Sequence, residues 1–143
     1  MASDQYTPGD IEAFVGEQVG EPVCALDPDL DLFQKFGIDG DDCVEFISQF
    51  GKAFDVNLSR YLWYFHHGEE PHAGFAFQIF WPAPNERVAR IPISPRVLLS
   101  SANAGIWTIE YPPYSLPKLR YDVIAAWLFL IPLLGFGLLL FSR

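Results

Sequence analysis

Basic side chains are scarce in the first sixty residues of this 143-residue chain, which carry three of them against thirteen acids. The remaining residues are close to neutral, so the formal net charge of −9 comes from the N-terminal part. An acidic surface repels nucleic acid and attracts basic protein surfaces. We therefore expect no nucleic-acid partner. The alternative to a basic protein partner is that the acids only keep a small domain soluble.

Cysteine is also scarce, and the motifs of common enzyme classes are missing. Cys24 and Cys43 are too few for a disulfide scaffold, and their spacing matches no metal motif. The chain has no G-x-S-x-G sequence and no glycine-rich phosphate loop. Its first residues lack the basic and apolar regions of a signal peptide. We expect a protein made in the cytoplasm that is not an enzyme and has no cofactor or metal.

A long apolar run is present near the C-terminus. Residues 123–141 contain no charged side chain and would form a helix of about 28 Å, close to the thickness of a membrane's hydrocarbon core. Arg96, Lys118 and Arg120 precede this run and only Arg143 follows it, which places the N-terminal side in the cytoplasm. The pattern predicts a tail-anchored, single-pass protein of a bacterial inner membrane.

Helix signals dominate the rest of the chain. Thr7 and Asp10 form a capping box ahead of a helix over 8–19, and a short apolar turn follows at 32–36. Asp39 can cap a helix that runs to Phe54. Within this helix, one face is expected to be apolar and to contain Val44, Ile47, Phe50 and Phe54. Phe46 makes this apolar face wider. A further helix is expected after Ser94, ending at Gly105.

Strand signals are fewer. Hydrophobic residues alternate over 75–81, which predicts a strand, and shorter strands are expected at 87–93 and 106–111. The sequence therefore predicts a mainly α fold with a small β addition and one C-terminal transmembrane helix. We expect a soluble domain over 1–111, a proline-rich linker over 112–122 and the membrane helix over 123–141.

Residues 32–58, LFQKFGIDGDDCVEFISQFGKAFDVNL, resemble an acyl carrier protein. The lead Phe36-Gly37-Ile38-Asp39 and the amphipathic helix after it match that family, which implies an acyl-carrier-like helical bundle. The family's phosphopantetheine serine falls at Gly40, which has no hydroxyl, so the resemblance implies the fold without the thioester role. The soluble part is also similar to a little-characterised bacterial carrier-like family with this Gly-Ile-Asp-Gly-Asp-Asp pattern.

The acids at the start of the carrier-like helix are the candidate site. Asp39, Asp41, Asp42 and Glu45 lie within seven residues, but they lack the longer ligand set of a calcium loop. In carrier-like folds this helix is the partner-binding surface. The resemblance thus implies that these four acids meet Lys or Arg side chains of a partner.

A second cluster is histidine-rich. His66, His67 and His72 lie beside Glu69 and Glu70, and three histidines can hold zinc. Adjacent histidines point in different directions, however, and no H-E-x-x-H spacing occurs, so a polar loop is the favoured interpretation.

Three functions remain open on the sequence alone. The first is a non-catalytic, membrane-anchored interaction or scaffold module that docks a basic protein partner. The second is a cargo-free regulator of fatty-acid or lipid enzymes, and the third is a small membrane metalloenzyme built on the histidine cluster.

Overall fold

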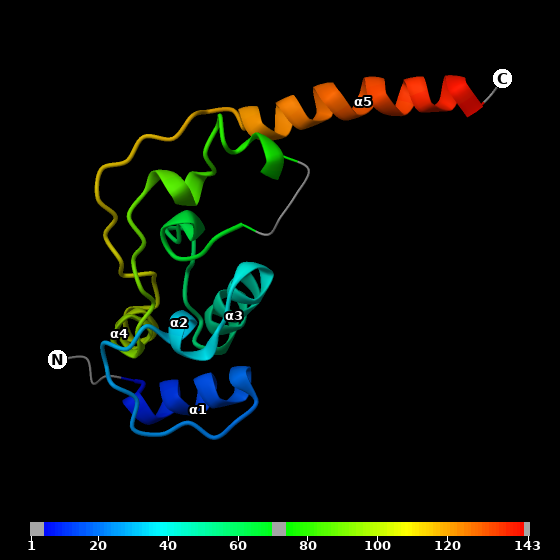
Figure 1. Cartoon of the computed structure of the whole chain (residues 1–143). Coiled ribbons are helices and arrows are strands. Elements are labelled where there is room, and N and C mark those ends of the chain that lie inside the picture. Colours follow the sequence, from blue (N-terminus) through cyan, green and yellow to red (C-terminus); the bar gives the residue numbers. More distant parts are fainter. Residues whose placement is uncertain (1–4, 70–73, 142–143) are drawn as a thin grey trace.

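The computed structural model describes residues 5–69 and 74–141, with side chains described as far as Gly137. Over this part the chain is mainly helical, and Figure 1 shows α1 to α4 grouped at one end while α5 projects from the other. The elements in chain order are α1 (Pro8–Val19), α2 (Leu32–Phe36), α3 (Gly40–Ala53), the 3-10 turns η1 (Trp63–Phe65), η2 (Phe75–Phe77) and η3 (Pro84–Arg87), then α4 (Pro95–Ala104) and α5 (Tyr121–Phe141).

Helix α1 begins at the capping residues that the sequence indicates. The carboxylate of Asp10 accepts hydrogen bonds from the Thr7 backbone N–H and from the Thr7 hydroxyl, both at 2.7 Å. These bonds hold the pKa of Asp10 below its usual value. The helix ends at Gly20, whose φ of 74° is in the left-handed region that glycine adopts without strain.

Helices α2 and α3 are also capped by aspartates. Asp31 accepts a hydrogen bond from the Gln34 N–H at 3.2 Å, and Asp39 accepts one from the Gly40 N–H at 2.9 Å. Between the two helices, Gly37 takes a φ of 64°, which turns the chain from α2 into the start of α3.

The buried face of α3 differs from the predicted register. Its fully or nearly fully buried apolar residues are Cys43, Phe46, Ile47 and Phe50, whereas Val44 is 52% exposed. The spacing i, i+3, i+4, i+7 from Cys43 is the ideal stripe of an amphipathic helix, and it leaves Val44 on the outer face. The prediction that Val44 faces the core is therefore wrong.

The core forms where these helices meet α4 and the segment after it. The ring of Phe14 on α1 makes edge-to-face contacts with the rings of Phe46, Phe50 and Phe54, at centroid distances of 5.2 to 5.8 Å. Leu98 of α4 and Trp107 complete the cluster and are fully buried. This single core fixes the position of α3 and therefore of the acids at its start.

The predicted strands are wrong for the described residues. Residues 75–77 form the 3-10 turn η2, and the segments 87–93 and 106–111 are not part of a β-ladder. The described chain has only an isolated parallel bridge between Asn57 and Ile106. Alternating hydrophobicity alone does not make a strand, because a strand needs a partner edge to satisfy its backbone groups.

The predicted membrane helix is also corrected. Over the described residues, the structure contains no helix that is both long enough and apolar enough to cross a membrane. The first turn of α5 contains Asp122, which is 2% exposed and paired with Arg120. The absence of a membrane-crossing helix from the described residues contradicts the expected transmembrane helix over 123–141 and the expected single-pass inner-membrane location.

Helix α5 contacts the rest of the chain near its start. The ring of Phe129 lies 5.4 Å from the ring of Phe77 in η2. Arg120 pairs with Asp122 at 2.7 Å and with Glu69 at 2.6 Å, which ties the beginning of α5 to the segment after η1.

Candidate interaction surface

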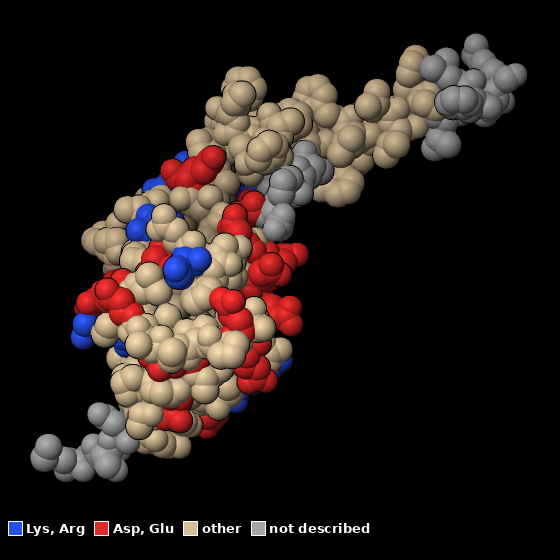
Figure 2. All heavy atoms as spheres, turned by 60° about the horizontal axis from the view of Figure 1, so that its bottom comes forward, with Lys and Arg blue, Asp and Glu red and all other residues tan. Residues whose placement is uncertain are grey.

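The four predicted site residues lie together at the start of α3. Asp39 is the helix cap, and Asp41 and Asp42 occupy the first turn, where the helix dipole favours negative charge. All three side chains are exposed, as is Glu45 one turn further along. Figure 2 shows Asp and Glu side chains gathered along one flank of the molecule, with few Lys or Arg side chains among them.

Four other acids of the described chain, Asp29, Asp31, Glu69 and Asp122, pair with an arginine, whereas the four acids at the start of α3 do not. Asp29 pairs with Arg96 at 2.7 Å, and Asp31 forms a bidentate ion pair with Arg90. Burial raises the pKa of Asp31, but the hydrogen bonds from Arg90 and from the Gln34 N–H outweigh it and hold the pKa below its usual value. Within residues 5–69 and 74–137, no ion pair involves Asp39, Asp41, Asp42 or Glu45.

Three hollows surround the start of α3, and each contains at least one of these acids. A hollow of about 620 Å³ contains Asp39, a second of about 300 Å³ contains Asp41, and a third of about 400 Å³ contains Asp42 and Glu45. The surface is therefore indented beside each charge, so that a partner's side chains can enter it.

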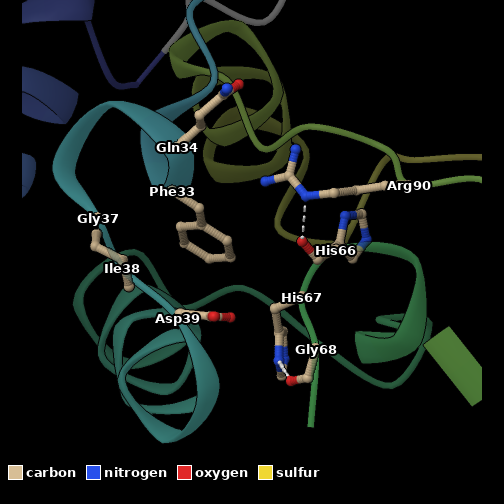
Figure 3. A pocket seen from close by; sticks show the side chains of 9 residues that line it. All are labelled: Phe33, Gln34, Gly37, Ile38, Asp39, His66, His67, Gly68 and Arg90. Carbon is tan, nitrogen blue, oxygen red and sulfur yellow. Dashed lines mark hydrogen bonds between the residues drawn. The ribbon is translucent and has the colours of Figure 1, made fainter. Parts of the chain in front are cut away.

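The first hollow lies between the α2–α3 turn and the segment after η1. Figure 3 shows the Asp39 carboxylate pointing across the hollow towards His67, with Phe33 above Asp39 and with Arg90 on the opposite side near His66. The Arg90 Nε–H donates to the carbonyl oxygen of His66 at 3.1 Å, while its other nitrogens bond to Asp31. The guanidinium of Arg90 is thus already paired with Asp31, whereas the carboxylate of Asp39 forms no ion pair among the described residues.

The histidine cluster divides into residues with different environments. His66 is fully buried, its Nδ1 lies 2.8 Å from the carbonyl oxygen of Ile91, and its Nε2 lies 2.8 Å from the hydroxyl of Tyr111. Because a carbonyl can only accept, Nδ1 carries the proton and the Tyr111 hydroxyl donates to Nε2. His66 is therefore a satisfied core residue.

The Tyr111 hydroxyl joins a buried network around His66. It accepts hydrogen bonds from the Trp107 indole N–H at 2.9 Å and from the Leu62 N–H at 3.1 Å. The ring of Tyr61 stacks on the ring of His66 at a centroid distance of 5.1 Å. This network fixes the path of the chain through η1 and therefore the position of His67.

His67 has an unsatisfied nitrogen. The residue is 8% exposed, and its Nδ1 donates to the carbonyl oxygen of Gly68 at 2.9 Å. With the proton on Nδ1, Nε2 is an acceptor, and it is buried without a hydrogen-bond partner. A buried unsatisfied polar group costs about 1–3 kcal/mol, so its presence beside two hollows calls for a functional explanation.

The structure does not assemble a metal site from the described residues. No group of three or more His, Cys, Asp or Glu side chains in that part of the chain is arranged to hold a metal ion. His72 and Glu70, which the zinc interpretation requires, lie outside the described residues. Cys43 is buried, and burial raises the pKa of its thiol to about 12, which disfavours the reactive thiolate.

The sequence predicted that the acids lie at a helix start, but it did not predict that Trp63, His67 and Arg90 are their neighbours. These side chains come from segments more than twenty residues further along the chain, and they meet α3 only through tertiary packing. The only sequence signal near them is the histidine pair, which favoured a polar loop.

The buried His66 predicts a pH dependence of stability. Burial lowers the pKa of His66 to about 4, whereas an unfolded histidine has a pKa of about 6.5. Between these values the unfolded chain binds a proton that the folded chain does not. The stabilisation is therefore fully present above about pH 6.5 and is lost as pH falls towards about 4. We expect urea titrations to show a loss on the order of 3 kcal/mol across this window.

A matched variant isolates this contribution. His66→Gln lacks a group that titrates in this window, so its stability should change much less between about pH 6.5 and about pH 4. If the free energy of unfolding fell equally with pH in the unaltered protein and in His66→Gln, the assignment of the pH dependence to His66 would be contradicted.

Fold and site together define a small, mainly helical domain with an unpaired acidic surface at the start of α3. A comparison with protein families matches residues 10–110 to the family described as "Protein of unknown function (DUF1493)". The match covers well over half of the chain, and the chain belongs to this family. No curated protein and no solved structure matches it.

The family assignment corrects the carrier interpretation. The matched family is not described as a carrier family, and the comparisons give no support to an acyl carrier protein relationship. The local pattern of a capped, acidic, amphipathic helix is real, but helix capping and a buried apolar stripe are general requirements of helices. They are not specific to carriers.

Proposed function

We propose that this domain is a protein-interaction module that docks a basic partner on the exposed acidic face of α3. The observation that carries the proposal is the cluster of exposed acids without an ion pair at the start of α3. Asp29, Asp31 and Asp122 each pair with an arginine of the same chain. Asp41, Asp42 and Glu45 are exposed around one helix start, and no ion pair among the described residues satisfies them.

The shape of the surface supports the same function. Hollows of about 300 and 400 Å³ flank the acids on two sides of α3, so a partner can insert side chains next to the charges. Val44 lines the hollow of about 300 Å³, is 52% exposed and offers apolar contact. Complementary charges at such a rim increase the association rate and set the orientation, while burial of apolar groups adds affinity.

The proposal is tested by binding of a defined probe. A short fluorescein-labelled peptide rich in arginine and alanine is titrated with the full chain, and binding is followed by fluorescence anisotropy. We expect saturable binding that weakens as salt rises, because screening shortens the range of the charges to about 8 Å at about 0.15 M. Glu45→Lys should weaken binding by about tenfold, which corresponds to about 1.4 kcal/mol.

The matched control is Glu110→Lys. Glu110 is also exposed and lies outside the three hollows around α3, so this variant changes the net charge equally. It should bind almost as well as the unaltered chain. An equal loss for both variants would mean that the peptide responds only to net charge, and the proposal would be rejected.

The alternative of a cargo-free regulator of lipid enzymes relied on the carrier resemblance. Because the comparisons do not support that resemblance, no observation on this chain favours a lipid enzyme over another basic partner.

A further inference from the structure

The hollow beside Asp41 differs from the other two in its construction. It has a volume of about 300 Å³ and lies between the first turn of α3 and the segment from η1 to Glu69. Trp63 and Val44 supply apolar walls, and Val44 is 52% exposed. The Trp63 ring is held in place by Tyr64 and by His67, whose rings each lie 5.6 Å away.

The polar groups of this hollow are hydrogen-bond acceptors. His67 lines it, and the Nε2 of that side chain is a buried acceptor without a partner, as the proton on Nδ1 requires. Asp41 adds a carboxylate that forms no ion pair among the described residues. Glu69 also lines the hollow, but its carboxylate pairs with Arg120.

These lining groups together determine which kind of chemical group can bind in the hollow. No Lys or Arg side chain is among the described residues that line the hollow. An anion would therefore meet Asp41 without a compensating charge, and a purely apolar group would leave both acceptors unsatisfied. The occupant that matches has an apolar stem, a positive charge and several N–H donors.

We propose that this hollow is a subsite for one arginine side chain of the partner. The inference depends on the proposed function and specifies the partner's chemistry. The planar guanidinium stacks on the Trp63 indole, donates to the Asp41 carboxylate, and donates to His67 Nε2 after a small adjustment of the ring. Lysine, with a compact and strongly hydrated ammonium, makes a poorer stack and is expected to bind less tightly.

The test uses a small probe rather than the unknown partner. The full chain is titrated with Nα-acetyl-arginine amide while the indole N–H signal of Trp63 is followed by NMR. We expect a saturable shift of this signal, a several-fold weaker response to Nα-acetyl-lysine amide, and no response to the neutral citrulline analogue. Equal shifts with arginine and citrulline, or no saturable shift with arginine, would overturn the inference.

Variants locate the binding. Asp41→Asn is exposed and isosteric, so its fold is not at risk, and it should weaken the arginine response at least fivefold. His67→Phe keeps a ring of similar size but removes the acceptor, and it should also weaken the response. Glu110→Gln removes a charge from an exposed residue outside this hollow and should leave the response nearly unchanged. If Asp41→Asn and the unaltered chain responded equally to the arginine amide, the probe would bind outside this hollow and the inference would be overturned.

The outcomes separate this inference from the proposed function. If the arginine-rich peptide binds and Glu45→Lys weakens it, while the Trp63 signal never responds to the arginine amide, the docking function is retained and the subsite is rejected. If the arginine amide binds at Trp63 but the peptide does not bind the chain, the subsite is retained and the docking function is rejected.

Discussion

Replacing Phe50 with alanine is expected to lower the free energy of unfolding by about 3–5 kcal/mol. Phe50 is fully buried, and its ring contacts the rings of Phe14 and Phe54 at centroid distances of 5.8 and 5.2 Å. The substitution removes a large apolar group and leaves a cavity between α1 and α3, which the surrounding rings can fill only in part. Urea-induced unfolding followed by circular dichroism measures the loss.

The matched control for this prediction lies on the same helix. Val44→Ala truncates a side chain that is 52% exposed, so its effect should stay below about 1 kcal/mol. A loss from Phe50→Ala that is no larger than the loss from Val44→Ala would mean that the core is not centred on this face of α3.

Tyr111→Phe should lower the free energy of unfolding by about 2–4 kcal/mol, which is large for the loss of one oxygen atom. The hydroxyl accepts from the Trp107 indole N–H and the Leu62 N–H, and it donates to His66 Nε2. Its removal leaves three buried polar groups without a partner. Tyr121→Phe is the control, because Tyr121 is 46% exposed and its hydroxyl lies outside this network.

A double-mutant cycle tests whether the network acts as a unit. Once Tyr111→Phe has removed the shared hydroxyl, Trp107→Phe no longer breaks an additional hydrogen bond. The losses of unfolding free energy in the two single variants should therefore sum to more than the loss in the double variant. Strict additivity would show that Tyr111 and Trp107 contribute independently.

Much of the helical structure could be predicted because its signals are local. Thr7 and Asp10 mark the start of α1, Asp39 caps α3, and Gly105 ends α4 in the left-handed conformation. Each signal acts within a few residues, so it does not depend on contacts with distant parts of the chain. The acids Asp41 and Asp42 were predictable for the same reason, since they belong to a helix start.

The errors come from features that depend on distant contacts. The register of α3 was misassigned because Val44 and Cys43 are both apolar, and only packing against α1 and α2 decides which of them is buried. The alternation over 75–81 predicted a strand, but Phe75 and Ile79 are 60% and 84% exposed around a 3-10 turn. Whether a segment forms a strand depends on a partner that the local pattern does not specify.

The same limit applies to the candidate site. His67 and Trp63 carry no periodic or motif signal, yet they form the walls of the hollow beside Asp41. Their position depends on the buried network of His66, Tyr111 and Trp107, which joins residues more than forty positions apart in the chain.

The most direct test of the acidic docking surface is a map of the peptide contact on the folded chain. Backbone amide signals of the full chain are recorded by NMR while the arginine-rich peptide is added. We expect the largest shifts at residues 39–48, with smaller shifts at Trp63 and His67. Shifts concentrated on other helices, or spread evenly over all exposed acids including Glu110, would contradict the assignment of α3 as the docking surface.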